Sequence, residues 1–424
     1  MLKVLHITSN DAKTGGAIAV ARLHEALLKA GHHSHILTFA DVPVGKTISR
    51  VDRSFFWRGV DAVTRRVTDL IALPYLFRFS TPAIWSAIDK IKPDLIHLHW
   101  TYSFGIPISM LPALTRRYPL VWTFHDMWAM TGGCTNSMGC ERWQSGCGNC
   151  PQWNGGLEVS SMHPLRRDST KDAWLIKQWF FAQAEFAVIC PSRWMMDEVQ
   201  SSPLLKNKPT YHIPNCIDTT FWKPLDKDKC KLALDIPADK YVVLFIGKPS
   251  NVFAYPGRRG ILVQTLDELA RSNIELSRRI VILLIGEGGQ DFVHQPYQTI
   301  SVRTVTSPAM LRICYSAADV LLNPTQFDNF PGVIQEAFAC GTPTVASDVG
   351  GVPDLVRHMC SGYLARPTQP REFAEGIQRI LFKPDLARQL GQSARHIAVE
   401  EYDEGTIANQ IADAYKNEIV RRNA

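Results

Sequence analysis

The sequence lacks several features that would assign it to a common class of protein. Its 424 residues contain no apolar run of about 18, so no membrane-spanning helix is expected. It has no low-complexity tract and no nucleic-acid motif, and a net charge of +6 is only mildly basic. The dinucleotide fingerprint Gly-x-Gly-x-x-Gly is absent after the first predicted strand, which argues against hydride transfer. The one Asp-x-Asp pair, Asp226 and Asp228, lies among lysines and is interpreted as a solvated turn.

Length and composition indicate a soluble enzyme with two domains. A chain of 424 residues is too long for one hydrophobic core. The composition is 46% hydrophobic and 20% charged, which is ordinary for such an enzyme. Residues 1–3 lead directly into an apolar alternation, which predicts a first strand rather than a cleavable signal sequence. We therefore expect a cytoplasmic protein.

Two series of strand-like runs alternate with helical patterns, which predicts two parallel sheets with crossover helices. Between them, residues 213–224 (IPNCIDTTFWKP) break the pattern with prolines and polar side chains. We predict an amino-terminal domain at 1–214, a second domain at 215–400 and a final helix within 401–424. The predicted strands are Lys3–Ile7, Ser34–Phe39, Asp94–His99, Leu120–Phe124, Phe186–Cys190 and Thr210–Ile213, then Tyr241–Ile246, Ile280–Ile285, Thr299–Val302, Val320–Leu322 and Thr344–Ala346.

One segment, residues 323–345 (NPTQFDNFPGVIQEAFACGTPTV), has the layout of a binding site. It places Asp328 in the loop after a buried strand and Glu336 about one turn into a helix that begins at Gly332. Loops and helix N-termini converge at the carboxyl edge of an open α/β sheet, so two carboxylates there predict a polyhydroxyl ligand. Such a pair taken alone is more often a solvated loop acid and a surface Glu. The helix is expected to turn one apolar face to the core, formed by Val333, Ala337 and Cys340.

The stretch TQFDNFPGVIQEAFACGTPTVAS resembles the acid-x7-Glu signature of family-four retaining glycosyltransferases. That resemblance implies the GT-B fold: two Rossmann-like α/β domains facing a cleft, with a carboxyl-terminal helix that crosses back to the first domain. It also implies that Asp328 faces the hydroxyls of a donor sugar and that Glu336 holds the ribose of its nucleotide. The first acid of the signature is more often Glu, and here it is the shorter Asp328.

The first half supplies further candidates for this site. Gly15 and Gly16 precede a helix, where glycines let the backbone approach a phosphate, although a plain tight turn is the commoner explanation. The family resemblance places Gly15, Gly16 and Ala17 against the donor diphosphate and the acceptor. It also matches His125, at the end of a strand, to a histidine that contacts the donor sugar. His99, at the end of a neighbouring strand, is a weaker candidate, since a lone histidine is more often structural.

Basic residues in the second half are candidates for binding the diphosphate. Arg259 lies at the start of a predicted helix, 261–270, where the helix dipole disfavours a cation and an anion would compensate it. The resemblance assigns Arg259 and Lys248 to the pair of basic residues that neutralise the leaving diphosphate. A solvated loop charge is the alternative for each. The resemblance implies that backbone groups near residues 302–306 read the base, so the sequence does not identify it.

Four cysteines between residues 134 and 150 have the spacing of a tight thiolate site. The pattern Cys-x5-Cys-x6-Cys-x2-Cys suits a structural zinc ion, and disulfides would not persist in a reducing cytoplasm. An iron–sulfur cluster, redox-labile thiols or unligated cysteines are the alternatives. The longer passage 125–151, from HDMW to GCGNCP, also resembles bacterial exopolysaccharide glycosyltransferases of the colanic-acid type. The predicted zinc ligands are Cys134, Cys140, Cys147 and Cys150.

A basic, aromatic stretch at 53–79 could lie on the inner face of a membrane, although helices packed on the domain are the simpler interpretation.

The sequence as a whole predicts a retaining hexosyltransferase that moves a sugar from a nucleotide-diphosphate donor to a glycan or lipid-linked acceptor in cell-surface polysaccharide synthesis. No cofactor is expected for catalysis and no nucleic acid as a partner. The alternatives are a sugar-nucleotide epimerase of the same fold and a non-catalytic, metal-bound partner in a polysaccharide assembly complex.

Overall fold

The computed structural model divides the chain into two compact units, unit 1 (Met1–Cys216 with Glu404–Ala424) and unit 2 (Ile217–Asp403). The predicted domain limits were 214 and 400. Of residues 258 and 259 only the backbone is described. The structure describes residues 1–8, 15–40, 45–51, 59–60, 63, 81–99, 106–153, 168–247, 258–286, 294–302, 305 and 307–423.

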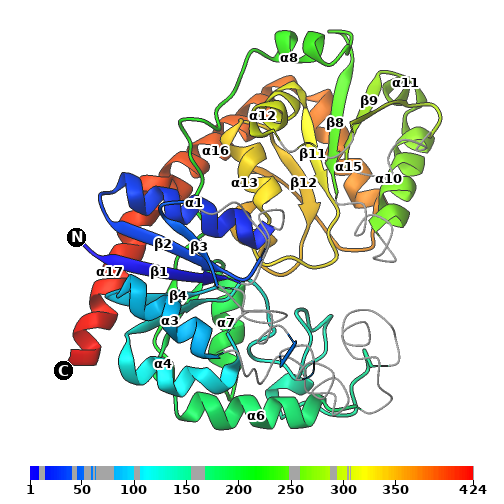
Figure 1. Ribbon diagram of the computed structural model, residues 1–424. Coiled ribbons are helices and arrows are strands. Elements are labelled where there is room, and N and C mark those ends of the chain that lie inside the picture. The colour runs from blue at the N-terminus through cyan, green and yellow to red at the C-terminus, as the bar shows by residue number, and fades with distance from the viewer. Residues whose placement is uncertain are drawn as a thin grey trace. The chain divides into compact units, whose positions relative to one another are not determined.

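Unit 1 is built on a seven-stranded parallel sheet with helices on both faces (Figure 1). The strand order β3-β2-β1-β4-β5-β6-β7 runs outward in both directions from β1 and β4, so the topological switch point lies between these two strands. The strands are β1 (Lys3–Thr8), β2 (His33–Thr38), β3 (Ile48–Arg50), β4 (Leu95–Leu98), β5 (Leu120–Thr123), β6 (Ala187–Cys190) and β7 (Thr210–His212).

The helices of unit 1 include the last helix of the chain, α17, which packs beside α1 (Figure 1). Apolar residues of α17 such as Ile407 and Ile411 join the core formed by β1, β4, β5 and β6. The carboxyl-terminal segment is therefore an integral part of unit 1. The helices are α1 (Gly15–Lys29), α3 (Thr81–Ile91), α4 (Leu111–Arg117), α6 (Thr170–Ala182), α7 (Arg193–Ser201) and α17 (Glu404–Asn423).

Unit 2 contains a six-stranded parallel sheet of order β10-β9-β8-β11-β12-β13, with its switch point between β8 and β11. Its strands are β8 (Tyr241–Ile246), β9 (Ile280–Ile285), β10 (Gln298–Val302), β11 (Val320–Asn323), β12 (Thr344–Ser347) and β13 (Gly362–Ala365). Its helices are α8 (Lys227–Ala233), α10 (Arg258–Ser272), α11 (Ile274–Arg278), α12 (Pro308–Ala317), α13 (Gly332–Ala339), α14 (Val352–Leu355), α15 (Pro370–Phe382) and α16 (Pro384–Tyr402).

Strand β8 shows how the sheet of unit 2 builds a core on each face. Val242 and Leu244 enter the core under α12, α13 and α16, whereas Val243 and Phe245 enter the one under α10 and α15. A strand covered on both sides can be apolar throughout, which is why it reads YVVLFI. Each fully buried aliphatic or aromatic side chain contributes about 1.5–3 kcal/mol to folding.

Three details of the fold differ from the prediction. Strands β3 and β13 were not predicted, and both are short, at three and four residues. Helix α10 begins at Arg258 rather than at Ile261. Helix α13 contacts the core through Val333, Ala337 and Cys340 as predicted, but its other sides are buried as well, from Ile334 through Ala339. No helix within the described ranges is long and apolar enough to cross a bilayer.

Candidate functional site

The loops that follow β11 and β12 meet at the carboxyl edge of the unit 2 sheet. Asp328 lies half-buried in the loop after β11, and its carbonyl oxygen accepts a hydrogen bond from the N–H of Gly351 (3.0 Å) in the loop after β12. Gly350 has a φ of +53°, and a Cβ there would overlap the same carbonyl oxygen. The backbone at Asp328 is thus held by a neighbouring loop that only glycine can bring close enough.

Helix α13 presents its amino terminus at the same edge of the sheet. The N–H groups of Gly332 and Val333 find no acceptor among the described residues, as is usual for a first helical turn. A Cβ added to Gly332 would meet no protein atom within 4 Å, so packing does not require glycine at this position. The open space above the helix start is suited to an anionic or polar ligand.

Glu336 lies one turn further along α13 and is only 8% exposed. The buried hydroxyl of Tyr315 on α12 donates a hydrogen bond to its Oε2 at 2.8 Å. A hydrogen bond to a carboxylate both fixes its orientation and offsets its partial desolvation. The carboxylate of Glu336 is therefore oriented before any ligand arrives.

Strands β8 and β9 also end in a paired glycine contact. Gly286 has a φ of +140°, and a Cβ there would overlap the carbonyl oxygen of Gly247. Only glycine fits at position 286, so the ends of these two strands lie close together on one side of the switch point. Arg259 is in the first turn of α10, where the structure describes its backbone alone, and Lys248 lies outside the described residues.

In unit 1, helix α1 begins at Gly15 and follows β1 at the switch point, so Gly15 and Gly16 lie in the helix rather than before it as predicted. Gly15 is exposed, Gly16 is half-buried and Ala17 is buried. A Cβ at Gly15 would meet nothing within 4 Å. As at Gly332, packing would allow a larger residue than glycine at this position.

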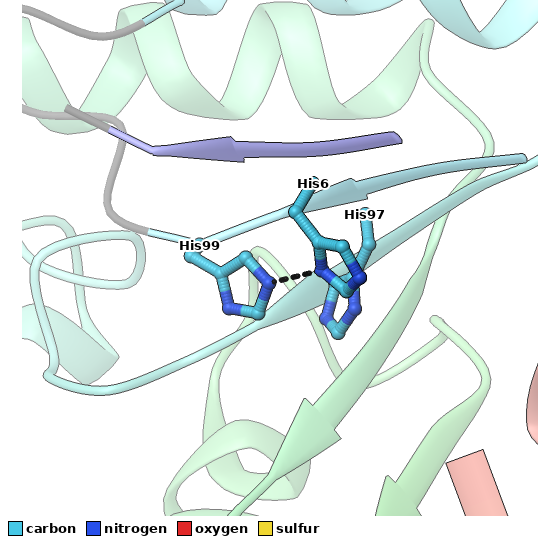
Figure 2. A group of neighbouring side chains, drawn as sticks. All are labelled: His6, His97 and His99. Carbon is cyan, nitrogen blue, oxygen red and sulfur yellow. Dashed lines mark hydrogen bonds between the residues drawn. The ribbon is translucent and has the colours of Figure 1, made fainter. Parts of the chain in front are cut away.

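A cluster of histidines occupies the carboxyl end of the unit 1 sheet at its switch point. His6 on β1 and His97 on β4 are register partners in parallel strands, and His99 follows on the same face. Figure 2 shows the three rings close together, with a hydrogen bond of 3.0 Å between His6 Nδ1 and His99 Nε2. His99 Nδ1 in turn lies 3.3 Å from Nε2 of His125, which follows β5. The four imidazoles form one connected group.

Burial keeps this group uncharged near neutral pH. It lowers the pKa of His6 to about 3 and that of His125 to about 4, and it holds the pKa values of His97 and His99 well below their usual range. Desolvation is the main cause in each case, because a charged ring would lose its hydration. Neutral imidazoles can each donate one hydrogen bond and accept another.

His6, His97 and His99 bring their ring nitrogens within 4.8 Å of one another, a spacing that could hold a metal ion. However, Nδ1 of His97 lies 2.6 Å from the hydroxyl of Tyr415, and its Nε2 lies 2.6 Å from the hydroxyl of Thr123. Both nitrogens of His97 are therefore used in hydrogen bonds. Hydrogen bonding thus explains the arrangement of the histidines.

The four predicted zinc ligands line one small cavity in unit 1 with Gly132, Gly148 and Thr170. Gly132 N–H donates to the sulfur of Cys147 at 3.1 Å. Thiol chemistry suits zinc, whose tetrahedral sites hold sulfurs about 3.8 Å apart. Among the described residues, the group with ligand atoms within 4.8 Å is the histidine trio, not the cysteines. The donor set therefore matches zinc, while the sulfurs are spaced more widely than a closed zinc site requires.

Lys177 on α6 is buried beside this cavity, with 1% of its surface exposed. Its ammonium donates to the carbonyl oxygens of Trp128 (2.5 Å) and Thr131 (2.8 Å). Desolvation lowers its pKa to about 7, although Cys147 and Cys134 oppose that shift. Burial raises the pKa of the Cys134 thiol to about 12 and that of Cys147 to about 11. The buried lysine ties α6 to the start of the cysteine loop.

Sequence reasoning missed several residues of these clusters. Tyr315 was not considered, because its contact with Glu336 spans two helices. His6 could have been found from the period-two pattern, since it shares a sheet face with His97 on the neighbouring strand. Lys177 and Tyr415 carried no signal in a helix pattern. The basic, aromatic stretch 53–79 lies outside the described residues except for residues 59, 60 and 63.

Comparisons with known proteins agree with this architecture. The model for Glycosyltransferase Family 4 matches residues 14–221, and the model for Glycosyl transferases group 1 matches residues 299–397. D-inositol 3-phosphate glycosyltransferase 1 of Catenulispora acidiphila is 29% identical over 89% of this chain and 86% of its own.

Two solved structures show the same fold. Sucrose-phosphate synthase of Thermosynechococcus elongatus covers 99% of this chain and 100% of its own, with 20% identity and a TM-score of 0.70. Anabaena Alr3699/HepE in complex with UDP-glucose covers 98% and 100%, with 18% identity and a TM-score of 0.62. The chain is thus a glycosyltransferase of the GT-B fold, in which residues 14–221 are similar to Glycosyltransferase Family 4 and residues 299–397 to Glycosyl transferases group 1.

Proposed function

We propose that the carboxyl edge of the unit 2 sheet binds a nucleoside-diphosphate sugar, whose sugar is transferred to an acceptor hydroxyl. The observation that carries this proposal is the convergence of Asp328, the start of α13 and the pre-oriented Glu336 beside the switch point between β8 and β11. Open α/β sheets bind ligands at such a point. The solved complex of HepE with UDP-glucose, a protein of the same fold, supports a donor of this class.

Each residue has a defined role in this proposal. Glu336 accepts hydrogen bonds from the ribose hydroxyls, and the N–H groups of Gly332 and Val333 donate to ligand oxygens. Asp328 faces the hydroxyls of the transferred sugar. A carboxylate with two oxygens can accept from vicinal hydroxyls, which distinguishes a sugar from an apolar ligand.

The other predicted site residues bind charge or position groups. Arg259 and Lys248 neutralise the diphosphate, and His125 orients the donor sugar. Gly15, Gly16 and Ala17 at the start of α1 face the phosphate and acceptor groups, as the open space at Gly15 allows. Stabilising the negative charge that grows on the leaving diphosphate supplies much of the catalysis.

The transfer proceeds with retention of the anomeric configuration. The bond between the sugar's C1 and the diphosphate oxygen breaks, while the acceptor oxygen bonds to C1 on the same face. The acceptor proton passes to the departing diphosphate. No side chain of the protein needs to bond to the sugar in this scheme, and no metal or cofactor is consumed.

The acceptor is a glycan or a lipid-linked oligosaccharide of a cell-surface polysaccharide. The likeness of residues 125–151, which include the four-cysteine loop 134–150, to colanic-acid-type enzymes supports this class of acceptor. The four cysteines of this loop would hold a structural zinc ion that braces it, and the basic stretch 53–79 would contact the inner face of the membrane. Metal analysis of the wild type and of Cys147→Ser with Cys150→Ser tests the zinc ion, since a metal-free wild type would disprove it.

Calorimetric titration with a panel of nucleoside diphosphates and their sugars tests the donor site. We expect Glu336→Gln to weaken binding about tenfold or more, because a charged hydrogen-bond acceptor contributes about 1.5–3 kcal/mol. Glu275→Gln is the matched control, since this carboxylate lies on the surface of the same unit, 78% exposed. If no nucleotide binds, or if both variants bind equally well, the donor site is wrong. Transfer to an added acceptor distinguishes the enzyme from an epimerase or a non-catalytic partner.

A further inference from the structure

In the histidine cluster of unit 1, one ring nitrogen determines which nitrogens donate hydrogen bonds and which accept them. His6 Nε2 is completely buried and has no hydrogen-bond partner, whereas His6 Nδ1 pairs with His99. A neutral imidazole carries a single N–H. The hydrogen of His6 is therefore either on Nδ1, shared with His99, or on Nε2, with no acceptor.

The two cases differ in what they leave unsatisfied. Hydrogen on Nε2 would bury an N–H donor without an acceptor, which is rarer in folded proteins than a buried acceptor without a donor. Hydrogen on Nδ1 leaves only an acceptor lone pair at the buried position. The second arrangement has His6 Nδ1–H donating to His99 Nε2.

The position of the hydrogen on His6 then fixes the position of the hydrogen on His99 and on His125. Because Nε2 of His99 accepts, the single hydrogen of His99 lies on Nδ1 and is donated to Nε2 of His125, 3.3 Å away. His125 accepts at Nε2 and so carries its own hydrogen on Nδ1. His97 does not compete, since its nitrogens pair with Tyr415 and Thr123.

We propose that His6 and His99 are positioning residues that hold His125 as the neutral tautomer with hydrogen on Nδ1. A neutral N–H donor on His125 matches the acceptor oxygens of a sugar or a phosphate. The assignment of His125 to the donor site rests on the proposed function. The tautomer itself rests only on the ring contacts. Burial, which lowers the pKa values of these rings, keeps them uncharged at neutral pH.

The test is a long-range proton–nitrogen correlation spectrum of the full-length protein with ¹⁵N-labelled histidine, recorded without nucleotide. Loss of one ring's signals in His125→Gln assigns that ring. We expect the Nδ1–H form of His125 in about tenfold excess, the ratio that one hydrogen bond of about 1–1.5 kcal/mol imposes. A spectrum with the hydrogen mainly on Nε2 of His125 overturns the proposal.

Substitutions at His99 test whether the chain sets that tautomer. His99→Leu removes the donor and should produce a mixture of both forms at His125. His99→Asn can place an amide N–H where Nδ1–H was and should restore the Nδ1–H form. His35→Gln, at a histidine that bonds Ser49 on β3, is the control and should leave His125 unchanged. An unchanged His125 in folded His99→Leu overturns the proposal, and if that variant does not fold, the wild-type and His99→Asn spectra decide.

These spectra and the nucleotide titration fail independently. If His125 shows the expected tautomer but no nucleotide binds, the proposed function fails and the histidine chain stands. If nucleotides bind while His125 carries its hydrogen on Nε2, only the chain is wrong.

Discussion

At the scale of single residues, the glycines of the candidate site separate into two physical classes. Gly350 and Gly286 have positive φ values and lie against neighbouring carbonyl oxygens, so the fold requires them. Gly15 and Gly332 have ordinary backbone angles, and open space surrounds the position of a Cβ. Folding does not explain the second class, and under the proposed function the close approach of a ligand does.

This division predicts opposite outcomes for two alanine substitutions. Gly350→Ala should destabilise unit 2 by about 1–3 kcal/mol, because it strains the backbone against Asp328. Gly332→Ala should leave stability within about 1 kcal/mol of the wild type, since alanine favours a helix, yet weaken nucleotide binding. Thermal unfolding and calorimetric titration measure the two effects. Equal loss of stability in both variants would contradict the division.

The buried histidines predict how stability depends on pH. The pKa of His6 falls from 6.5 in the unfolded chain to about 3 in the fold. Between these values the unfolded state binds a proton that the folded state does not, so the free energy of unfolding decreases as the pH falls below about 6.5. The loss is about 1.4 kcal/mol per pH unit for each such group.

Urea unfolding at pH values from about 4 to 7 measures this slope. His6→Gln should reduce this slope by about 1.4 kcal/mol per pH unit, the contribution of one bound proton, whatever the variant does to stability at neutral pH. His33→Gln, at an exposed position at the start of β2, is the control and should keep the wild-type slope. An unchanged slope in His6→Gln would show that this ring is protonated in the folded state.

At the scale of elements, α17 shows how a terminal helix is anchored to a distant sheet. Tyr415 is completely buried and its hydroxyl bonds Nδ1 of His97 at 2.6 Å. Arg422 donates to the carbonyl oxygens of Arg116 and Tyr118 at the end of α4. The helix thus supplies apolar core, a buried hydrogen bond and a cap for another helix.

Tyr415→Phe tests the buried hydrogen bond. Removing the hydroxyl leaves a buried imidazole nitrogen without its partner, so unit 1 should lose about 1–3 kcal/mol of stability. Val420→Ala, at a residue of the same helix that is 67% exposed, should change stability by less than about 0.5 kcal/mol. Urea unfolding compares the two, and equal stabilities would mean that the bond contributes nothing.

At the scale of the whole molecule, the two units differ in how they use the chain. Unit 2 is one continuous segment with a core on each face of its sheet. Unit 1 is made of two separate segments of the chain, because α17 packs into the hydrophobic core formed by strands of residues 1–216. A fragment should therefore fold only if it contains every segment that contributes to its hydrophobic core.

Residues 217–403 expressed alone should fold cooperatively, since their cores need no other part of the chain. Residues 1–216 alone should aggregate or stay unfolded, because the apolar surface normally covered by α17 would face water. Adding residues 404–423 as a separate peptide should restore some soluble, folded unit 1. Circular dichroism and analytical gel filtration report both results. A well-folded fragment 1–216 would show that α17 is dispensable.

Much of this protein could be predicted from its sequence. The alternation of apolar strands and helical patterns predicted eleven strands at nearly their observed positions, because a buried parallel strand must be a short apolar run. Asp328 and Glu336 could be placed in a loop and on a helix from the spacing of Pro331 and Gly332 alone. Motifs that act through local geometry are visible without a structure.

What the sequence could not supply were contacts between distant elements. The hydrogen bond of Tyr315 to Glu336, the connection of His6 through His99 to His125 and the pairing of His97 with Tyr415 each join separate elements. The periodicity of a helix does not reveal which residues of other elements it contacts. Strands β3 and β13 were too short to give a recognisable apolar pattern. The sequence by itself determined the α/β class, the two sheets and the acid-bearing loop, since each follows from local periodicity and turn chemistry. Only the tertiary structure decided which glycines the fold requires, which carboxylate is held in place and which histidines form a chain, because packing of distant segments creates those contacts.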